Sequence, residues 1–139
     1  MYLIKEKFNF RDLANVVLLQ KRVLLVIDEI TLQDIYVRHL EAQQFLVTTA
    51  KFADFFAIAE AVKSADMLIL DFNKFIFNQR LEFLKSLVKS FPHLPVITIG
   101  FSLEEEMLSS LMALGIVGHL DRKLSRPQDL LALIKTLIV

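Results

Sequence analysis

The sequence predicts an α/β fold: a three-layer sandwich with a five-stranded parallel sheet between layers of helices. Short apolar runs recur without polar alternation, which is typical of strands buried on both faces. Segments with helical spacing separate these runs at intervals of roughly 20 to 30 residues, the length of one parallel strand–helix repeat. Hydrophobic residues make up 55% of the 139 residues, as expected when helices cover both faces of the sheet.

Composition limits the classes of partner. Lys plus Arg and Asp plus Glu number 16 each, so no basic excess supports nucleic-acid binding. Without cysteine the chain has neither disulfides nor thiolate metal sites. No apolar stretch is long enough to cross a membrane, and no signal-peptide pattern occurs, so we expect a cytoplasmic protein that does not contact membranes.

The expected domain spans residues 21–139, and residues 1–20 form an N-terminal extension. Asn9 can cap a helix in this extension, with Phe10, Leu13 and Val17 on one apolar stripe. Such a helix packs either on its own domain or on a partner, and the sequence leaves both open.

Each strand of the domain is expected where an apolar run is bounded by polar or turn residues. These runs lie at residues 23–27, 45–47, 67–70, 96–99 and 117–120.

A helix is expected after each of these strands. Thr31, Asn78, Ser102 and Ser125 are the candidate N-caps of the first, third, fourth and fifth helices, and residues 52–62 carry the second. Pro92 ends the third helix, and Gly115 ends the fourth as a left-handed cap residue. Right-handed crossovers then favour the flavodoxin-like strand order 2-1-3-4-5.

Two acidic residues mark the carboxyl edge of the predicted sheet. Asp28 follows the first strand and Asp71 the third, and these strands are neighbours in the expected order. Two carboxylates and a backbone carbonyl suit Mg²⁺, and an aspartate can also be a nucleophile toward a phosphoryl group. The alternative is that either residue only caps the following helix.

Four segments together resemble the receiver domain of bacterial two-component response regulators (CheY-like), from Lys21 to the end of the chain. They are Val23–Glu29, Leu68–Asp71, Pro95–Gly100 and Gly118–Arg122. The resemblance implies that Asp71 is the candidate phospho-acceptor, that Arg122 stands at the invariant-lysine position, and that Asp28, Asp71 and the carbonyl of Asn73 are candidate metal ligands.

The chain departs from the receiver pattern at five positions. Ile27 stands where we expect the first member of the acidic pair, and Gly100 replaces the hydroxyl residue that ends the fourth strand. Arg122 replaces lysine, His119 replaces the switch aromatic, and Phe75 replaces a proline. The resemblance is therefore to an atypical receiver, for which we expect weak Mg²⁺ binding and no other cofactor.

The sequence gives little support for a nucleotide-phosphate, flavin or histidine-ligand site. The three glycines form no phosphate loop, and residues 29–31 are poor for a flavin phosphate. His39, His93 and His119 lie on separate elements. Phe72, Phe75 and Phe77 follow the acceptor position and indicate either local packing or an apolar partner patch.

These patterns favour a stand-alone signalling module that acts by protein–protein interaction, with phosphoryl transfer weak or lost, rather than an enzyme. The alternative is a phosphorelay receiver that accepts a phosphoryl group on Asp71 from a histidine kinase; a third is a small-molecule binder. Expected partners are a histidine kinase, a downstream effector or a second copy of the chain. The face of the fourth helix, fifth strand and fifth helix would bind them, with Met107, Leu111 and Met112 as candidate contacts. We expect no attached output domain, since the sequence ends with the fifth helix.

Overall fold

The computed structural model describes residues 21–101, 103–122 and 125–138, so the predicted N-terminal helix lies outside the described residues. Strands and helices alternate along the chain. The strands are β1 (Arg22–Val26), β2 (Leu46–Ala50), β3 (Met67–Asn73), β4 (Val96–Phe101) and β5 (Gly118–Asp121). The helices are α3 (Ile30–Ala42), α4 (Phe55–Val62), α5 (Phe77–Ser90), α6 (Glu105–Ala113) and α7 (Pro127–Ile138).

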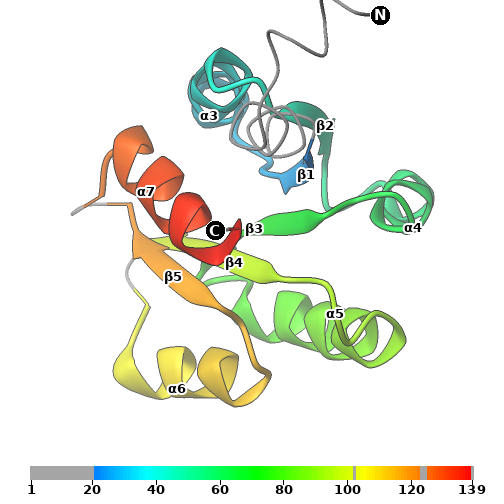
Figure 1. Ribbon diagram of the computed structural model, residues 1–139. Coiled ribbons are helices and arrows are strands. Elements are labelled where there is room, and N and C mark those ends of the chain that lie inside the picture. Colours follow the sequence, from blue (N-terminus) through cyan, green and yellow to red (C-terminus); the bar gives the residue numbers. More distant parts are fainter. Residues whose placement is uncertain (1–20, 102, 123–124, 139) are drawn as a thin grey trace, which may run out of the picture.

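The five strands form one parallel sheet in the order β2-β1-β3-β4-β5, which confirms the predicted fold class and topology. Helices α3 and α7 cover one face of the sheet, and α4, α5 and α6 cover the other (Figure 1). Because each face carries a layer of helices, both sets of alternating strand side chains are apolar. Leu24, Leu68 and Leu70 pack toward α4–α6, and Leu25 and Ile69 pack toward α3 and α7.

Strand β3 is longer than the apolar run that predicted it. It continues through Asp71 to Asn73, because these residues pair in register with Ile99 and Phe101 of β4. Asp71 therefore belongs to the strand itself, and only 7% of its surface is exposed. This pairing is a tertiary contact, which the local sequence does not encode.

The structure also revises the predicted helix caps. Helix α5 begins at Phe77, so Asn78 lies inside it and is not the cap. Helix α3 begins at Ile30 without a side-chain cap, and α4 is capped by Asp54, which accepts a hydrogen bond from the backbone N–H of Ala57. The predicted cap Ser102 lies outside the described residues, whereas Gly115 has the predicted positive φ, 87°. Among the helices described, none is both long and apolar enough to span a membrane.

Candidate functional site at the carboxyl edge of the sheet

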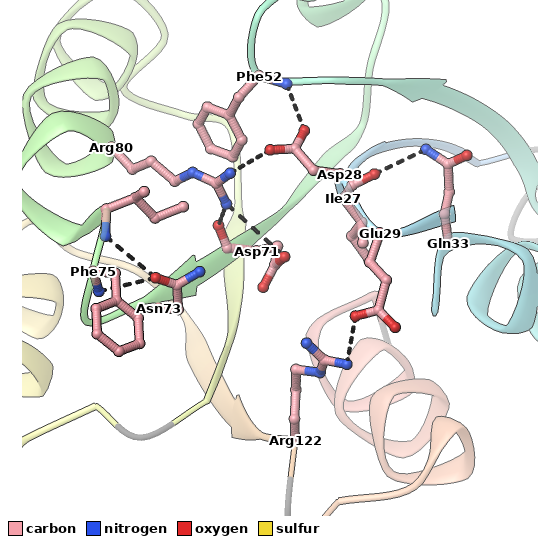
Figure 2. Close-up of polar contacts among 11 residues, drawn as sticks. Ile27, Asp28, Glu29, Gln33, Phe52, Asp71, Asn73, Phe75, Arg80 and Arg122 are labelled. Atoms are coloured by element: carbon pink, nitrogen blue, oxygen red, sulfur yellow. Dashed lines mark hydrogen bonds and ion pairs between the residues drawn. The ribbon is translucent and has the colours of Figure 1, made fainter. Parts of the chain in front are cut away.

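Asp28 and Asp71 meet at the carboxyl edge of two paired strands. Strands β1 and β3 run side by side with Val26 opposite Leu70, so the residues that follow stand at the same edge. Figure 2 shows the two carboxylates on either side of a third charged group, the guanidinium of Arg80. The sequence predicted that the two acids come together, but Arg80 was not among the predicted site residues.

Arg80 reaches the acids from α5. One terminal nitrogen donates to the backbone carbonyl of Asp71, and the other donates to Oδ2 of Asp28. The first of these nitrogens also lies 3.9 Å from Oδ2 of Asp71. Arg80 is 7% exposed because it belongs to the buried stripe of α5, between Phe77 and Leu84. A charged residue at a core position of an amphipathic helix is the sequence signal that would have revealed it.

Phe52, in the loop after β2, contacts both Arg80 and Asp28. Its ring stacks on the guanidinium, with its centroid 3.8 Å from Cζ of Arg80, which is cation–π geometry. Its backbone N–H donates to Oδ1 of Asp28 at 3.0 Å. Phe83 packs edge-on against the same ring, with centroids 5.5 Å apart. Each carboxylate oxygen of Asp28 thus has a protein donor.

Burial and charge oppose each other at Asp71. Desolvation raises the pKa of its carboxyl above the ordinary value, against the lowering effect of Arg80 and Arg122, while Asp28 and Glu29 raise it further. Burial likewise lowers the pKa of Arg80, and Asp28 and Asp71 counteract this. The acids therefore keep a buried guanidinium charged.

Arg122 follows β5 and pairs with a different acid. Its terminal nitrogen donates to Oε2 of Glu29 at 2.9 Å, and its backbone N–H donates to the carbonyl of Gly100 at 2.9 Å. The structure thus places Arg122, which the resemblance puts at the invariant-lysine position, at the same edge as Asp71. Glu29, which directly follows Asp28, was not among the predicted site residues. Ile27 is buried in the core and its side chain contributes no oxygen; its backbone carbonyl accepts a hydrogen bond from Nε2 of Gln33 at 3.1 Å.

The side chain of Asn73 shapes the loop between β3 and α5. Its Oδ1 accepts hydrogen bonds from the backbone N–H of Phe75 at 2.9 Å and of Ile76 at 3.2 Å. The phenylalanines of this segment have different roles. Phe72 and Phe77 pack in the core with centroids 5.7 Å apart, whereas Phe75 is 87% exposed. Local packing therefore explains two of them, and only Phe75 is accessible to a partner.

Gly100 and His119 fit together on neighbouring strands. A Cβ atom at position 100 would lie 2.6 Å from Cε1 of His119 and 2.8 Å from Cδ1 of Leu103. Nδ1 of His119 lies 2.7 Å from the buried Oγ1 of Thr98, its register partner on β4. Burial lowers the pKa of His119, although Asp121 raises it. The imidazole thus occupies the space that a side chain at position 100 would need.

These residues do not fit a bound Mg²⁺. Mg²⁺ requires free oxygen ligands in near-octahedral geometry. Both oxygens of Asp28 and the carbonyl of Asp71 already accept hydrogen bonds, and a guanidinium lies between them. Within the described part of the chain, no cluster of three or more His, Cys, Asp or Glu residues is arranged to hold a metal.

Comparison with known proteins places the fold. No family model and no curated protein matches the sequence. Among solved structures, a CheY-like protein, TadZ, from Pseudomonas aeruginosa shares 20% identity with a TM-score of 0.69, over 85% of this chain and 99% of that chain. The chemotaxis protein CheY4 of Vibrio cholerae shares 24% identity with a TM-score of 0.70, over 84% of this chain and 98% of that chain. For a response regulator of Thermotoga maritima the identity is 18% and the TM-score 0.72, over 86% of this chain and 98% of that chain.

The chain therefore has the fold of CheY-like receiver domains, as the resemblance in sequence predicted. At these identities the likeness establishes the fold, and the chemistry must be argued from the site.

Proposed function

We propose that this protein is a receiver-like signalling module of the two-component type. It works by binding another protein, and phosphoryl transfer to Asp71 is slow or lost. Gly100 and His119 carry this proposal, because among the residues that the structure describes they leave no hydroxyl side chain beside Asp71 at the end of β4.

Switching requires that phosphorylation of Asp71 be coupled to a movement of the loop after β4. In receivers, as the resemblance implies, a hydroxyl at this position bonds the phosphoryl group and moves the loop after β4. Here the position is a glycine, and the neighbouring imidazole already has a partner, Thr98. A phosphoryl group on Asp71 would lack this differential contact, and a ligand without one cannot shift an equilibrium. We therefore expect the binding surface to be formed in the unphosphorylated protein.

We place this surface on the face made by α6, β5 and α7. Of the three contacts suggested by the sequence, Leu111 is fully buried and Met107 packs partly on the core, so neither leads the interface. Met112 is 60% exposed and is its apolar centre. Partners of this face would be a histidine kinase, a downstream effector or a second copy of the chain.

Treatment with acetyl phosphate and Mg²⁺, followed by intact-protein mass spectrometry, tests the chemistry. Loss of one preorganised donor costs about 10²–10³ in rate, so we expect little mass gain on the timescale of an ordinary receiver. The control is Asp71→Asn. A prompt mass gain in the wild type that disappears in this variant would overturn the proposal.

A binding assay tests the mode of action. The Asp71→Ala variant should bind the partner as well as the wild type does, and Met112→Asp should weaken binding. Binding that requires both Asp71 and a phosphodonor would contradict the proposal.

Binding that depends on Asp71 and a phosphodonor would favour an ordinary receiver phosphorylated on Asp71 by a histidine kinase. One observation favours this alternative: Asp71 lies in a buried strand beside the positive charges of Arg80 and Arg122, which oppose the rise that burial causes in its pKa. Such charges also stabilise a transferring phosphoryl group.

A further inference from the structure

We infer that Arg80 is a built-in cation: its guanidinium stands between Asp28 and Asp71 where a divalent ion would otherwise bind, and it closes this site to Mg²⁺. The inference relies on the receiver-like function only for the choice of ion. Its test measures metal binding and not partner binding, so the two proposals can fail separately.

The oxygen atoms around Arg80 are of a type that binds Mg²⁺. Oδ2 of Asp28, the carbonyl oxygen of Asp71 and Oδ2 of Asp71 all lie around the terminal nitrogens of Arg80, and all three are of the oxygen type that Mg²⁺ prefers. A guanidinium is a planar fork whose donors can reach several such oxygens at once. Figure 2 shows this fork between the two acids, with contacts to each.

Neighbouring groups fix the Arg80 side chain in place. Its side chain is 8% exposed, and the ring of Phe52 lies against one face of the guanidinium. The same Phe52 fixes Asp28 through its backbone N–H. Displacing Arg80 would separate it from Phe52 and from both acids, and would leave its charge poorly solvated.

Electrostatic repulsion also disfavours a metal ion beside Arg80. A divalent ion that entered beside Arg80 would stand a few ångströms from another positive charge, and this repulsion is strong in a partly buried site. A tethered guanidinium, by contrast, is always present at the site. The acidic edge should therefore keep one arrangement at every Mg²⁺ concentration, which suits a module that binds its partner constitutively.

The Arg80→Met variant tests this inference. Methionine keeps an apolar stem that can lie on Phe52 but removes the charge. Titrations with Mg²⁺, followed through backbone amide shifts, and with Mn²⁺, followed through paramagnetic broadening, report binding directly. Arg38→Met, on the exposed side of α3, is the matched control because it makes the same chemical change away from the site.

In the wild type and in Arg38→Met we expect no saturable shift at millimolar Mg²⁺. In Arg80→Met we expect saturable shifts and Mn²⁺ broadening at Asp28, Phe52 and Asp71. Adding Asp28→Asn to Arg80→Met should abolish both signals. Saturable binding by the wild type at this edge, or a folded Arg80→Met that gains none, would overturn the inference.

A measurement on the wild type covers the case in which Arg80→Met does not fold. The side-chain N–H signals of Arg80 should be resolved and slowly exchanging, because both terminal nitrogens are bonded and buried. Millimolar Mg²⁺ should leave these signals unchanged. Their broadening or loss on addition of Mg²⁺ would show that the metal displaces the guanidinium, and the inference would be wrong.

Discussion

Two corners of the sheet edge differ in what fills them. At the β1–β3 corner a charged side chain, Arg80, lies between two acids and under an aromatic ring. At the β4–β5 corner an imidazole, His119, lies over Gly100 and pairs with one hydroxyl, that of Thr98. The receiver resemblance implies a metal ion at the first corner, and a hydroxyl and an aromatic side chain at the second.

The difference lies in the forces that keep each side chain in place. Charge holds the first corner, where carboxylates and a backbone carbonyl surround a buried cation. Packing stabilises the second corner, where the absence of a Cβ atom at Gly100 leaves room for the ring of His119. Charge substitutions should therefore disrupt the first corner, whereas an added side chain or a proton should disrupt the second.

The largest expected effect is at the first corner. Arg80→Ala leaves Asp28 and Asp71 without their common counter-ion. Removing one partner of a buried ion pair costs about 3–5 kcal/mol. Asp28 is 43% exposed in its side chain and remains partly solvated, so we expect a loss of about 2–4 kcal/mol in the free energy of unfolding.

Urea denaturation measures this loss. Lys85→Ala, at an exposed position of the same helix, is the control and should change stability by less than about 0.5 kcal/mol. A loss at Arg80 no larger than that at Lys85 would show that the ion pair contributes little.

The second corner should respond to an added Cβ. Gly100→Thr restores the hydroxyl but forces its Cβ against His119 and Leu103, so we expect destabilisation by about 1–3 kcal/mol. Combining it with His119→Ala should recover part of this loss, because the small side chain vacates the space. Additive losses in the double mutant, measured by thermal unfolding, would mean that the imidazole is not the obstacle.

The sequence predicts the strands that form both corners, but not how the side chains of Arg80 and His119 occupy them. Unalternated apolar runs and their spacing are enough for the strand order, and the order brings Asp28 and Asp71 together. Arg80 was not among the predicted site residues, although its spacing from Phe77 and Leu84 places it on the buried stripe of α5. The position of His119 depends on Gly100 of another strand, which is a tertiary relation that no local pattern contains.

A smaller effect is expected in the pH dependence of the free energy of unfolding, to which His119 of the second corner contributes. Burial lowers the pKa of His119 below its ordinary value, so the folded state binds fewer protons than the unfolded state as the pH falls through the unfolded pKa of about 6.5. The contribution of neutral His119 is thus fully present above that pH and decreases below it, toward the lowered folded pKa. His119→Asn should reduce the fall in stability between about pH 7 and pH 5.

Denaturation curves at several pH values test this sign. His39 and His93 are present in both proteins, so the difference between wild type and His119→Asn isolates the one imidazole. An unchanged pH profile in the variant would show that the imidazole titrates alike in the folded and unfolded states.

The smallest effect is expected at the ion pair that lies between the two corners. A terminal nitrogen of Arg122 lies 2.9 Å from Oε2 of Glu29, but the Glu29 side chain is 53% exposed, so solvent screens the pair. Exposed pairs of this kind contribute about 0–1 kcal/mol. A double-mutant cycle with Arg122→Ala and Glu29→Ala should therefore give a coupling energy below about 1 kcal/mol, far less than a cycle with Arg80→Ala and Asp28→Ala. Salt should weaken the first coupling and hardly change the second, because a buried pair is poorly screened. Equal couplings, with equal sensitivity to salt, would mean that burial does not distinguish the two arginines and that Arg80 holds the edge no more firmly than a surface charge.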